Sequence, residues 1–327
     1  MIEFLPRAEP VVVVAGPTAA GKSGVAIELA LRFGGEIVNA DSMQVYRGLD
    51  IGTAKPSLAE RARVPHHLLD VVPPTVAYNA GRYSREARAA AAEIHARGGR
   101  VFLTGGTGLY IRAFLEGLID DGEPDPTFRA HLEREADAAA AEGDPGRLHR
   151  RLAAVDADAA RRIHPNDRRR TIRALELVTR IGVPASQLRA RHDFGDRPFR
   201  VLYLVLDPGQ SELDARIDAR AAAMIGAGLL QECRALREAG YGPELRPMQA
   251  IGYRHLMAVV DGQDTLDNAL AGMRRDTRHF ARRQRTWFRA VRDAAWITPD
   301  DPRAIESRVQ AFLEAGADAA RYCALDM

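Results

Sequence analysis

The feature that most restricts the fold of this chain is the octapeptide GPTAAGKS at positions 16–23. It matches the pattern Gly-x4-Gly-Lys-Ser/Thr, and it follows the apolar, β-branched run at positions 11–14. The apolar residues of the next segment, 24–33, have helical spacing, and the segment stops before Gly34. A buried strand, a glycine-rich turn and a helix in this order predict a phosphate-binding loop in a parallel α/β sheet.

The residue types of this loop suit a diphosphate or a triphosphate. Glycines let successive backbone N–H groups converge on phosphate oxygens, and the amino terminus of the helix adds its positive end. Lys22 supplies a compact charge, and the Ser23 hydroxyl can ligate Mg²⁺. Lys22 and Lys55 are the only lysines among 46 basic residues, which indicates that these two positions require a lysine in place of an arginine. The expected diphosphate-binding residues are Gly16, Pro17, Thr18, Ala19, Ala20, Gly21, Lys22 and Ser23.

Further strands and helices alternate along the chain. Segments 36–41, 100–106 and 200–207 are apolar strand candidates, and 83–99 is an amphipathic helix that ends at two glycines. Alternation of this kind is typical of a parallel sheet with right-handed crossovers and helices on its faces. The sequence therefore predicts an α/β fold of the P-loop NTPase type.

The segment 120–195 interrupts this alternation. It contains no strand candidate, is rich in alanine, arginine and glutamate, and is followed by the strand candidate 200–207. We therefore expect a mostly helical insertion at 120–195 within one α/β core, which is formed by 1–119 and 196–327 and includes carboxy-terminal helices.

The composition restricts the location and the class of cofactor. No stretch of about eighteen consecutive apolar residues occurs, and the amino-terminal segment carries Glu3 and Glu9 in place of a basic and then an apolar run. Two cysteines are too few for a disulfide framework or a four-ligand zinc site. We therefore expect a cytoplasmic protein with no membrane partner. The net charge of +2 conceals two basic stripes, 161–173 and 274–292.

A carboxylate for acid–base chemistry is expected in the crevice outside the carboxyl ends of the strands. An NTPase usually has an acidic residue at the end of another central strand, whereas strand 100–106 leads into Thr-Gly-Gly-Thr-Gly, whose hydroxyl and backbone donors suit diphosphate oxygens. Asp41 ends the strand candidate 36–41 and is the first choice. Asp70 and Asp207 stay open as competitors.

Six segments beyond the phosphate loop resemble the bacterial tRNA dimethylallyltransferases, in order and over roughly residues 11–290. They are DSMQVYRGLDIGTAKP (41–56), PHHLLD (65–70), GGTGLY (105–110), RIHPNDRRRTIRALE (162–176), QAIGYR (249–254) and TRHFARRQRTWFR (277–289). The resemblance implies an enzyme that moves a dimethylallyl group from its diphosphate to N6 of the adenosine next to the anticodon, position 37, in tRNAs that read codons beginning with U. Diphosphate is released, and Mg²⁺ is the implied cofactor.

The resemblance also implies roles for individual residues. The phosphate loop holds the diphosphate of the allyl donor, Asp41 is the base toward adenine N6, Thr107 supports the departing diphosphate, and Arg220 is its cationic partner. The anticodon stem-loop is the implied partner, the insertion is a lid that faces it, and a monomer is expected. The implied tRNA contacts are Asp41, Ser42, Met43, Gln44, Thr107, Arg129, Arg169, Arg170, Thr171, Ile172, Arg173, Gln249, Ala250, Ile251, Gly252, Tyr253, Arg254, Arg282, Arg283, Gln284, Arg285, Thr286, Trp287, Phe288 and Arg289.

Several residues in these segments have a plainer interpretation. One of Trp287 and Phe288 is expected to pack inward, because both lie on a helix with an apolar face. The pair His66–His67 is not expected to bind a metal, since adjacent side chains point to different sides and no further nitrogen or sulfur ligand is near in sequence. The role of Lys55 stays open. His255 stands where relatives often carry an acidic residue, which leaves the detail of that segment open.

Three other functions fit parts of the sequence. A P-loop kinase for a small metabolite would share the strand, loop and helix, and would consume ATP. A transferase of the same chemistry could use a free adenine nucleotide as acceptor, although the two arginine stripes favour a large polyanion. An RNA-binding module with a vestigial phosphate loop is the third, and the intact Lys22, Ser23 and Asp41 count against it.

Overall fold

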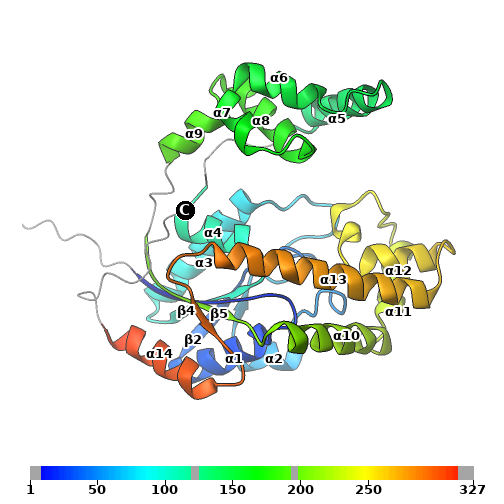
Figure 1. Ribbon diagram of the computed structural model, residues 1–327. Helices are drawn as coiled ribbons and strands as arrows, with labels where there is room; N and C mark the ends of the chain where they lie inside the picture. The colour runs from blue at the N-terminus through cyan, green and yellow to red at the C-terminus, as the bar shows by residue number, and fades with distance from the viewer. Residues whose placement is uncertain (1–8, 119–124, 193–197, 316–327) are drawn as a thin grey trace, which may run out of the picture. The chain divides into compact units, whose positions relative to one another are not determined.

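The computed structural model of the chain describes residues 9–118, 125–192 and 198–315. Contacts divide the chain into two compact units, one formed by residues 1–116 with 197–327 and the other by residues 117–196 (Figure 1). The segment 120–195, expected to be an insertion, lies within the second unit.

The first unit is built on a six-stranded parallel sheet with the order β3-β2-β4-β1-β5-β6. The four central strands were predicted and are confirmed to within two residues at each end. The strands β3 and β6 at the two edges were not predicted, because two or three residues are too few to show an apolar pattern. The strands are β1 (Glu9–Ala15), β2 (Gly35–Asn39), β3 (His66–His67), β4 (Arg100–Gly105), β5 (Phe199–Leu206) and β6 (Ala295–Ile297).

Both faces of the sheet are covered, which explains the uninterrupted apolar run in β1. Val11 and Val13 belong to one apolar cluster, Val12 and Val14 belong to the other, and each is at most 1% exposed. A strand that is buried on both faces has no polar side to alternate with.

The helices of this unit fall into two layers (Figure 1). One layer packs on the cluster that contains Val12, and its helices are α1 (Lys22–Phe33) and α14 (Pro302–Glu314), with the short helix α2 (Leu58–Arg63) beside α1. The other layer packs on the cluster that contains Val11 or extends from it, and consists of α3 (Ala80–Ala96), α4 (Gly108–Glu116), α10 (Gln210–Gly226), α11 (Leu229–Glu238), η1 (Arg246–Gln249), α12 (Tyr253–Val260) and α13 (Leu266–Arg289). The helix α1 ends before Gly34, as expected.

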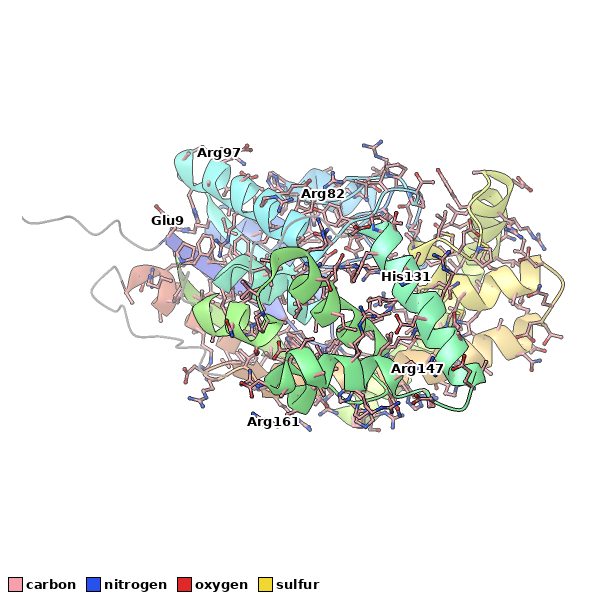
Figure 2. All side chains as sticks on the ribbon, turned by 90° about the horizontal axis from the view of Figure 1, so that it is seen from above. Glu9, Arg82, Arg97, His131, Arg147 and Arg161 are labelled. Carbon is pink, nitrogen blue, oxygen red and sulfur yellow. The ribbon has the colours of Figure 1, made fainter. Side chains whose placement is uncertain are left out.

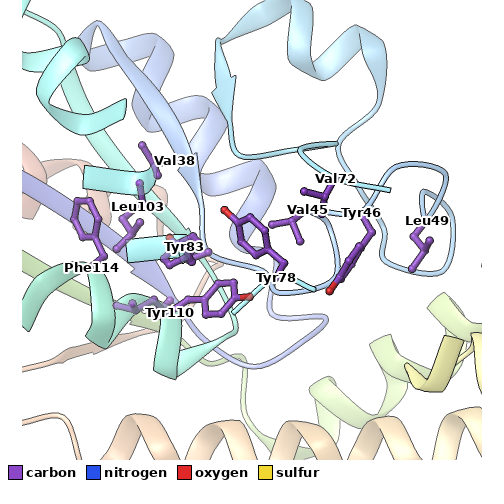
Figure 3. Close-up of a cluster of buried hydrophobic side chains, with 14 of the residues drawn as sticks. Val38, Val45, Tyr46, Leu49, Val72, Tyr78, Tyr83, Leu103, Tyr110 and Phe114 are labelled. Carbon is purple, nitrogen blue, oxygen red and sulfur yellow. The ribbon is translucent and has the colours of Figure 1, made fainter. Parts of the chain in front are cut away.

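A group of tyrosines joins the second layer to the loop that follows β2 (Figure 3). The rings of Tyr83 in α3 and Tyr110 in α4 stack with centroids 4.1 Å apart, and Tyr78 lies 6.4 Å from Tyr110. Tyr46, in the loop after β2, is buried in the same cluster. These rings fix that loop against α3 and α4, and they place it next to the carboxyl ends of the central strands.

The second unit is entirely helical in its described residues and has its own small core. Leu132, Leu148, Leu152 and Leu175 form its centre. Aspartates cap three of its helices, since the side chains of Asp125, Asp156 and Asp167 each accept a hydrogen bond from a backbone N–H group of the first turn. The helices are α5 (Pro126–Ala141), α6 (Arg147–Val155), α7 (Ala157–Arg162), α8 (Arg168–Ile181) and α9 (Ala185–His192).

Candidate active site

The phosphate loop lies between β1 and α1, at the carboxyl end of the sheet. Its first residue, Gly16, has φ 146°, and a Cβ atom at this position would lie 2.4 Å from the Leu206 carbonyl oxygen of the neighbouring strand. Only glycine fits that combination of conformation and space. The Lys22 ammonium folds back over the loop and donates to the Pro17 carbonyl oxygen at 2.7 Å. The loop therefore has its charged group in place over the expected phosphate position.

A second cation stands beside this lysine. Arg220 of α10 reaches the Thr18 hydroxyl with a 3.5 Å contact, and its charge acts on Lys22. Burial and the neighbouring Arg220 lower the pKa of Lys22 to about 8, although the charge of Asp41 opposes the change. Burial also lowers the pKa of Arg220, against the same carboxylate. Lys22 and Arg220 are thus two desolvated cations, and the charge of Asp41 acts on both. A bound anion would stabilise the charged forms of the two side chains.

Asp41 and Thr107 meet at the carboxyl ends of β2 and β4. The Thr107 hydroxyl accepts the Ser42 N–H at 3.1 Å, and the Thr107 N–H donates to the Ala40 carbonyl at 3.1 Å. One oxygen of Asp41 accepts the Met43 N–H at 2.8 Å. In the part of the chain that the structure describes, Asp41 forms no ion pair within 4 Å, so this carboxylate keeps an oxygen for another group.

The Asn39 side chain holds the backbone of Asp41 in place. The Asn39 side chain accepts the Asp41 N–H at 3.2 Å and donates to the carbonyls of Asp41 and Leu68, at 3.3 and 3.1 Å. Asn39 is only 5% exposed. A buried amide with these bonds holds the turn that carries Asp41 in one position.

The two competing aspartates are engaged elsewhere. Asp70 forms ion pairs with Lys55 at 2.6 Å and with Arg61 at 2.7 Å, and these cations lower its pKa against the opposing effect of burial. Asp207 accepts from Arg285 at 2.8 Å and from the Gly209 N–H at 3.0 Å. Of the three candidates, Asp41 is therefore the one that has no cationic partner in contact within the described ranges.

Lys55 has a structural role. Its side chain is 1% exposed, and its ammonium donates to the Tyr46 carbonyl at 2.8 Å and to Asp50 and Asp70 at 2.6 Å each. A guanidinium is larger and planar and would not fit three acceptors around one nitrogen. This explains the lysine in a chain that otherwise uses arginine, and it ties together the loop that begins at Asp41.

The same loop is held from outside by Glu232 of α11. Its carboxylate accepts the N–H groups of Asp50, Ile51 and Gly52, at 3.2, 2.8 and 3.4 Å, and the Tyr253 hydroxyl at 2.6 Å. Sequence reasoning missed Glu232, because a glutamate on a helix gives no local signal of a backbone partner about 180 residues away.

Two residues of the expected tRNA set at 41–44 have internal roles. The Gln44 side chain is 9% exposed and donates to the carbonyls of Thr53 and Ala54 at 3.1 and 3.3 Å. The Asp41 side chain caps its own turn, as described above. Ser42 and Met43 are partly exposed beside them.

The helix α13 has an inner and an outer side within the motif 282–289. Gln284 and Phe288 are buried, Trp287 is partly buried against the core, and Arg285 is paired with Asp207. The inward position of Phe288 confirms that one of the two aromatic residues packs inside. Gln284 and Phe288 are buried, so their side chains support the helix from inside, and a contact between them and tRNA stays a prediction. The outward residues are Arg282, Arg283, Thr286 and Arg289.

The segment 249–254 is similarly divided. Tyr253 is fully buried, so its side chain supports the segment and does not form its surface. Gly252 is buried, Ala250 and Ile251 are partly buried, and Gln249 and Arg254 are exposed, with Arg254 paired to Asp276.

His255 caps the start of α12. Its Nδ1 accepts the Gly252 N–H at 3.3 Å, as a carboxylate would, and its Nε2 lies 3.1 Å from Asp276. Burial lowers the pKa of His255, which favours the neutral ring that this pair of bonds requires.

In the helical unit the expected tRNA residues also separate into two groups. Arg129 forms two bonds to Glu176, at 2.9 and 2.6 Å, and Arg173 pairs with the same buried carboxylate at 2.5 Å. Thr171 and Ile172 are 1% and 3% exposed, so their side chains pack inside the unit, and a contact between them and tRNA stays a prediction. Arg169 and Arg170 are exposed on α8.

The basic stripe 161–173 is partly neutralised by carboxylates of the same unit. Arg161, labelled in Figure 2, pairs with Asp158, and Arg168 pairs with Glu133 and Asp137. Arg147, labelled in the same view, pairs with Glu142 and Asp144. For Arg162 and Arg169, both exposed, no ion pair occurs among the described residues.

The described residues hold no cluster of three His, Cys, Asp or Glu side chains that could bind a metal by themselves. The two histidines of the pair His66–His67 have different partners. His67 Nε2 lies 2.7 Å from a carboxylate oxygen of Glu36, and His66 Nδ1 lies 2.7 Å from the Val64 carbonyl oxygen. A magnesium ion at the phosphate loop would need the oxygens of a bound diphosphate, to which Ser23 at the start of α1 could add its hydroxyl.

Across the described ranges, none of the helices has the length and apolar character needed to span a bilayer.

Known protein families match most of this chain. The chain matches the family model "IPP transferase" over residues 44–291 and the model "Isopentenyl transferase" over residues 9–70. It is 46% identical to a tRNA dimethylallyltransferase of Desulfatibacillum aliphaticivorans over 310 residues, which are 95% of this chain and 100% of that protein.

Solved structures give the same result. A tRNA isopentenylpyrophosphate transferase of Bacillus halodurans is 34% identical with a TM-score of 0.69, and the match covers 95% of this chain and 98% of that one. A eukaryotic dimethylallyltransferase, described as acting on tRNA, is 30% identical with a TM-score of 0.74, over 86% of this chain and 70% of that one. The chain belongs to the IPP transferase family.

Proposed function

We propose that this protein transfers a dimethylallyl group from dimethylallyl diphosphate to N6 of the adenosine next to the anticodon, position 37, in tRNAs that read codons beginning with U. Membership of the IPP transferase family and the names of its relatives support the transfer of a dimethylallyl group to tRNA. The choice of position and of tRNAs is the finer part of the proposal.

The observation that carries the proposal is the placement of opposite charges around the phosphate loop. Among the described residues, no carboxylate forms an ion pair with Lys22 or Arg220, and the charge of Asp41 acts on both, opposing the lowering of their pKa by burial. An anionic donor on the cationic side and a proton acceptor on the other side are what an alkyl transfer to an amine requires.

The reaction would be divided between these groups. The adenine N6 attacks the allylic carbon, a C–N bond forms, the C–O bond to diphosphate breaks, and a proton leaves N6. Asp41 accepts that proton, because the new bond builds positive charge on a nitrogen whose lone pair is otherwise shared with the ring. Lys22, Arg220 and the Thr107 hydroxyl stabilise the growing charge of the diphosphate.

Magnesium would be held chiefly by the diphosphate oxygens, with Ser23 as its protein ligand. When bound, the ion would neutralise leaving-group charge. The hydroxyl of Ser23 fits this use, because Mg²⁺ usually keeps several water ligands and binds phosphate oxygens with few ligands from the protein.

The tRNA would be bound by exposed arginines on each unit. Exposed arginines of the expected set are Arg282, Arg283 and Arg289 on α13, Arg169 and Arg170 on α8, and Arg254 on α12, which is paired with Asp276. They suit backbone phosphates, which fix position without reading sequence. A stacked base cannot reach Asp41, so the adenosine must be extruded from the loop. We further propose that the protein acts as a monomer in the cytoplasm.

The test is incubation of the protein with an unmodified tRNA transcript, labelled dimethylallyl diphosphate and Mg²⁺, followed by nucleoside analysis. Label on the adenosine at position 37 supports the proposal, and a transcript with guanosine at that position is the matched control. If label appeared on free adenosine monophosphate in a parallel incubation but not on tRNA, the acceptor would be the free nucleotide and not tRNA. Consumption of ATP with no label transfer would favour a kinase.

A further inference from the structure

Gln284 is a buried side chain that joins two loops of the site. It lies on α13, is 6% exposed, and stands 178 residues from one of its partners and 266 from the other. Its Oε1 accepts the Thr18 N–H at 2.8 Å, and its Nε2 donates to the Gly106 carbonyl at 2.8 Å. Both ends of the amide are therefore used, one on the phosphate loop and one on the loop after β4.

Each partner of Gln284 leads directly to a group with a role in the proposed reaction. The Thr18 hydroxyl meets Arg220, at 3.5 Å. Gly106 immediately precedes Thr107, whose hydroxyl accepts the Ser42 N–H beside Asp41. The donor side of the site is thus connected to the acceptor side through one amide.

The space around this amide is closed. A Cβ atom at Gly106 would lie 2.3 Å from Gln284 Nε2, and one at Gly108 would lie 2.1 Å from Trp287 Nε1. Gln284, Trp287 and Phe288 form the inner side of this part of α13, so the helix cannot shift without displacing all three. The position of the amide is therefore determined by packing as well as by its two hydrogen bonds.

We propose that Gln284 is a positioning residue for the transfer reaction, one that sets the distance between the diphosphate held by the phosphate loop and the Asp41–Thr107 side that receives the adenosine. The inference rests on the proposed function. It replaces the tRNA contact that the family resemblance implied for this residue, since a side chain buried between two loops has no surface to offer an RNA.

The consequence is kinetic. A substrate pair held in a reactive geometry loses on the order of 10²-fold in rate when one member shifts by about 1 Å. Removal of the amide should therefore lower the rate of the chemical step and leave the affinity for tRNA unchanged. A contact with tRNA would have the opposite signature.

The experiment compares Gln284→Met, which keeps the length but loses both hydrogen bonds, with wild type and with Gln310→Met. Gln310 lies exposed on α14 and, among the described residues, donates a hydrogen bond to Glu314 alone, so it serves as a control for the substitution itself. Single-turnover rates at saturating dimethylallyl diphosphate, tRNA dissociation constants and melting temperatures are measured for all three proteins.

We expect the single-turnover rate of Gln284→Met to fall about 30- to 300-fold, with a tRNA dissociation constant within threefold of wild type. A rate within threefold of wild type, or a loss confined to tRNA affinity, would overturn the inference. Wild type and Gln310→Met report on the proposed function separately: if neither transfers label, it is that proposal which fails.

A second perturbation covers the case in which Gln284→Met does not fold. Gly106→Ala places a methyl group against the same amide without changing Gln284, and Gly106 has no positive φ that would forbid alanine. Gly106→Ala should slow single turnover when Gln284 is present. In a protein that already carries Gln284→Ala, adding Gly106→Ala should slow single turnover little further, because the methyl group then has room. Fully additive losses in the double variant would show that the two positions act independently and would overturn the inference.

Discussion

The charge state of Lys22 should control the affinity for diphosphate. Burial and Arg220 lower the pKa of this lysine to about 8 in the free protein, and a bound diphosphate would raise it again. Since only the protonated form attracts the anion, the apparent dissociation constant scales with the reciprocal of the protonated fraction. With a pKa of about 8, that fraction falls from about 0.9 at pH 7 to about 0.1 at pH 9. The dissociation constant should therefore rise about tenfold, or about 1.4 kcal/mol.

The assay is calorimetric titration of the protein with magnesium pyrophosphate from pH 6.5 to pH 9.5. Lys22→Arg is the matched control, because a guanidinium stays protonated over this range and pyrophosphate titrates identically in both experiments. The ratio of the two dissociation constants should be flat below about pH 7 and change about tenfold between pH 7 and pH 9. A ratio that stays constant up to pH 9.5 would refute the reasoning, since Lys22 would then keep its charge throughout.

Three further outcomes follow from the same contacts. Lys22→Met should abolish transfer yet stabilise the free protein by at most about 3 kcal/mol at pH 7. Folding lowers the pKa of Lys22, so the charged lysine destabilises the folded protein below pH 8, and this destabilisation disappears between pH 8 and 10.5. A urea series that finds the variant less stable than wild type at about pH 7 would contradict this. Lys55→Met should lower the free energy of unfolding in urea by about 3 kcal/mol, because Asp70 and Asp50 lose their shared cation. Arg63→Met, which removes the exposed ion pair with Glu28, should lower it by less than about 1 kcal/mol. Arg169→Gln and Arg282→Gln should each weaken tRNA binding severalfold and reduce the slope of log K against log salt by about 0.7 to 0.9, while Arg161→Gln, already paired with Asp158, should change neither.

The core of the fold could be predicted because its signals are local. A β-branched apolar run such as 11–14, bounded by Pro10 and Gly16, favours a buried strand, and GPTAAGKS in the turn after it favours a phosphate-binding loop. The edge strands gave no such signal: the register of β3 and β6 is set by their neighbours in the sheet and not by their own few residues.

The candidate site was predictable where one segment carries the chemistry and unpredictable where distant segments meet. Lys22, Asp41 and Thr107 all follow strands, so their place at one end of the sheet follows from topology. The partners of Glu232 and Gln284 are backbone groups far away in sequence, which no local pattern encodes.

The sequence also did not predict which side chains are buried within the motifs that carry the family resemblance. In the motif 282–289 the residues alternate between surface and core with helical spacing, so a motif implied as one tRNA-binding block divides into exposed arginines and buried supports. Gln284 illustrates the point, because a polar residue in a basic motif would be placed on the surface by composition alone.

The central claim is that Asp41 receives the proton while the phosphate loop holds the leaving group. It is tested most directly by the single-turnover rate of Asp41→Asn at saturating dimethylallyl diphosphate and tRNA, with the dissociation constants of magnesium pyrophosphate and tRNA measured alongside. The asparagine can still accept the Met43 N–H that the aspartate accepts now. We predict a fall of about 10²- to 10⁴-fold in rate with both constants changed less than about fivefold. A rate within threefold of wild type would contradict the account, because another group would then accept the proton.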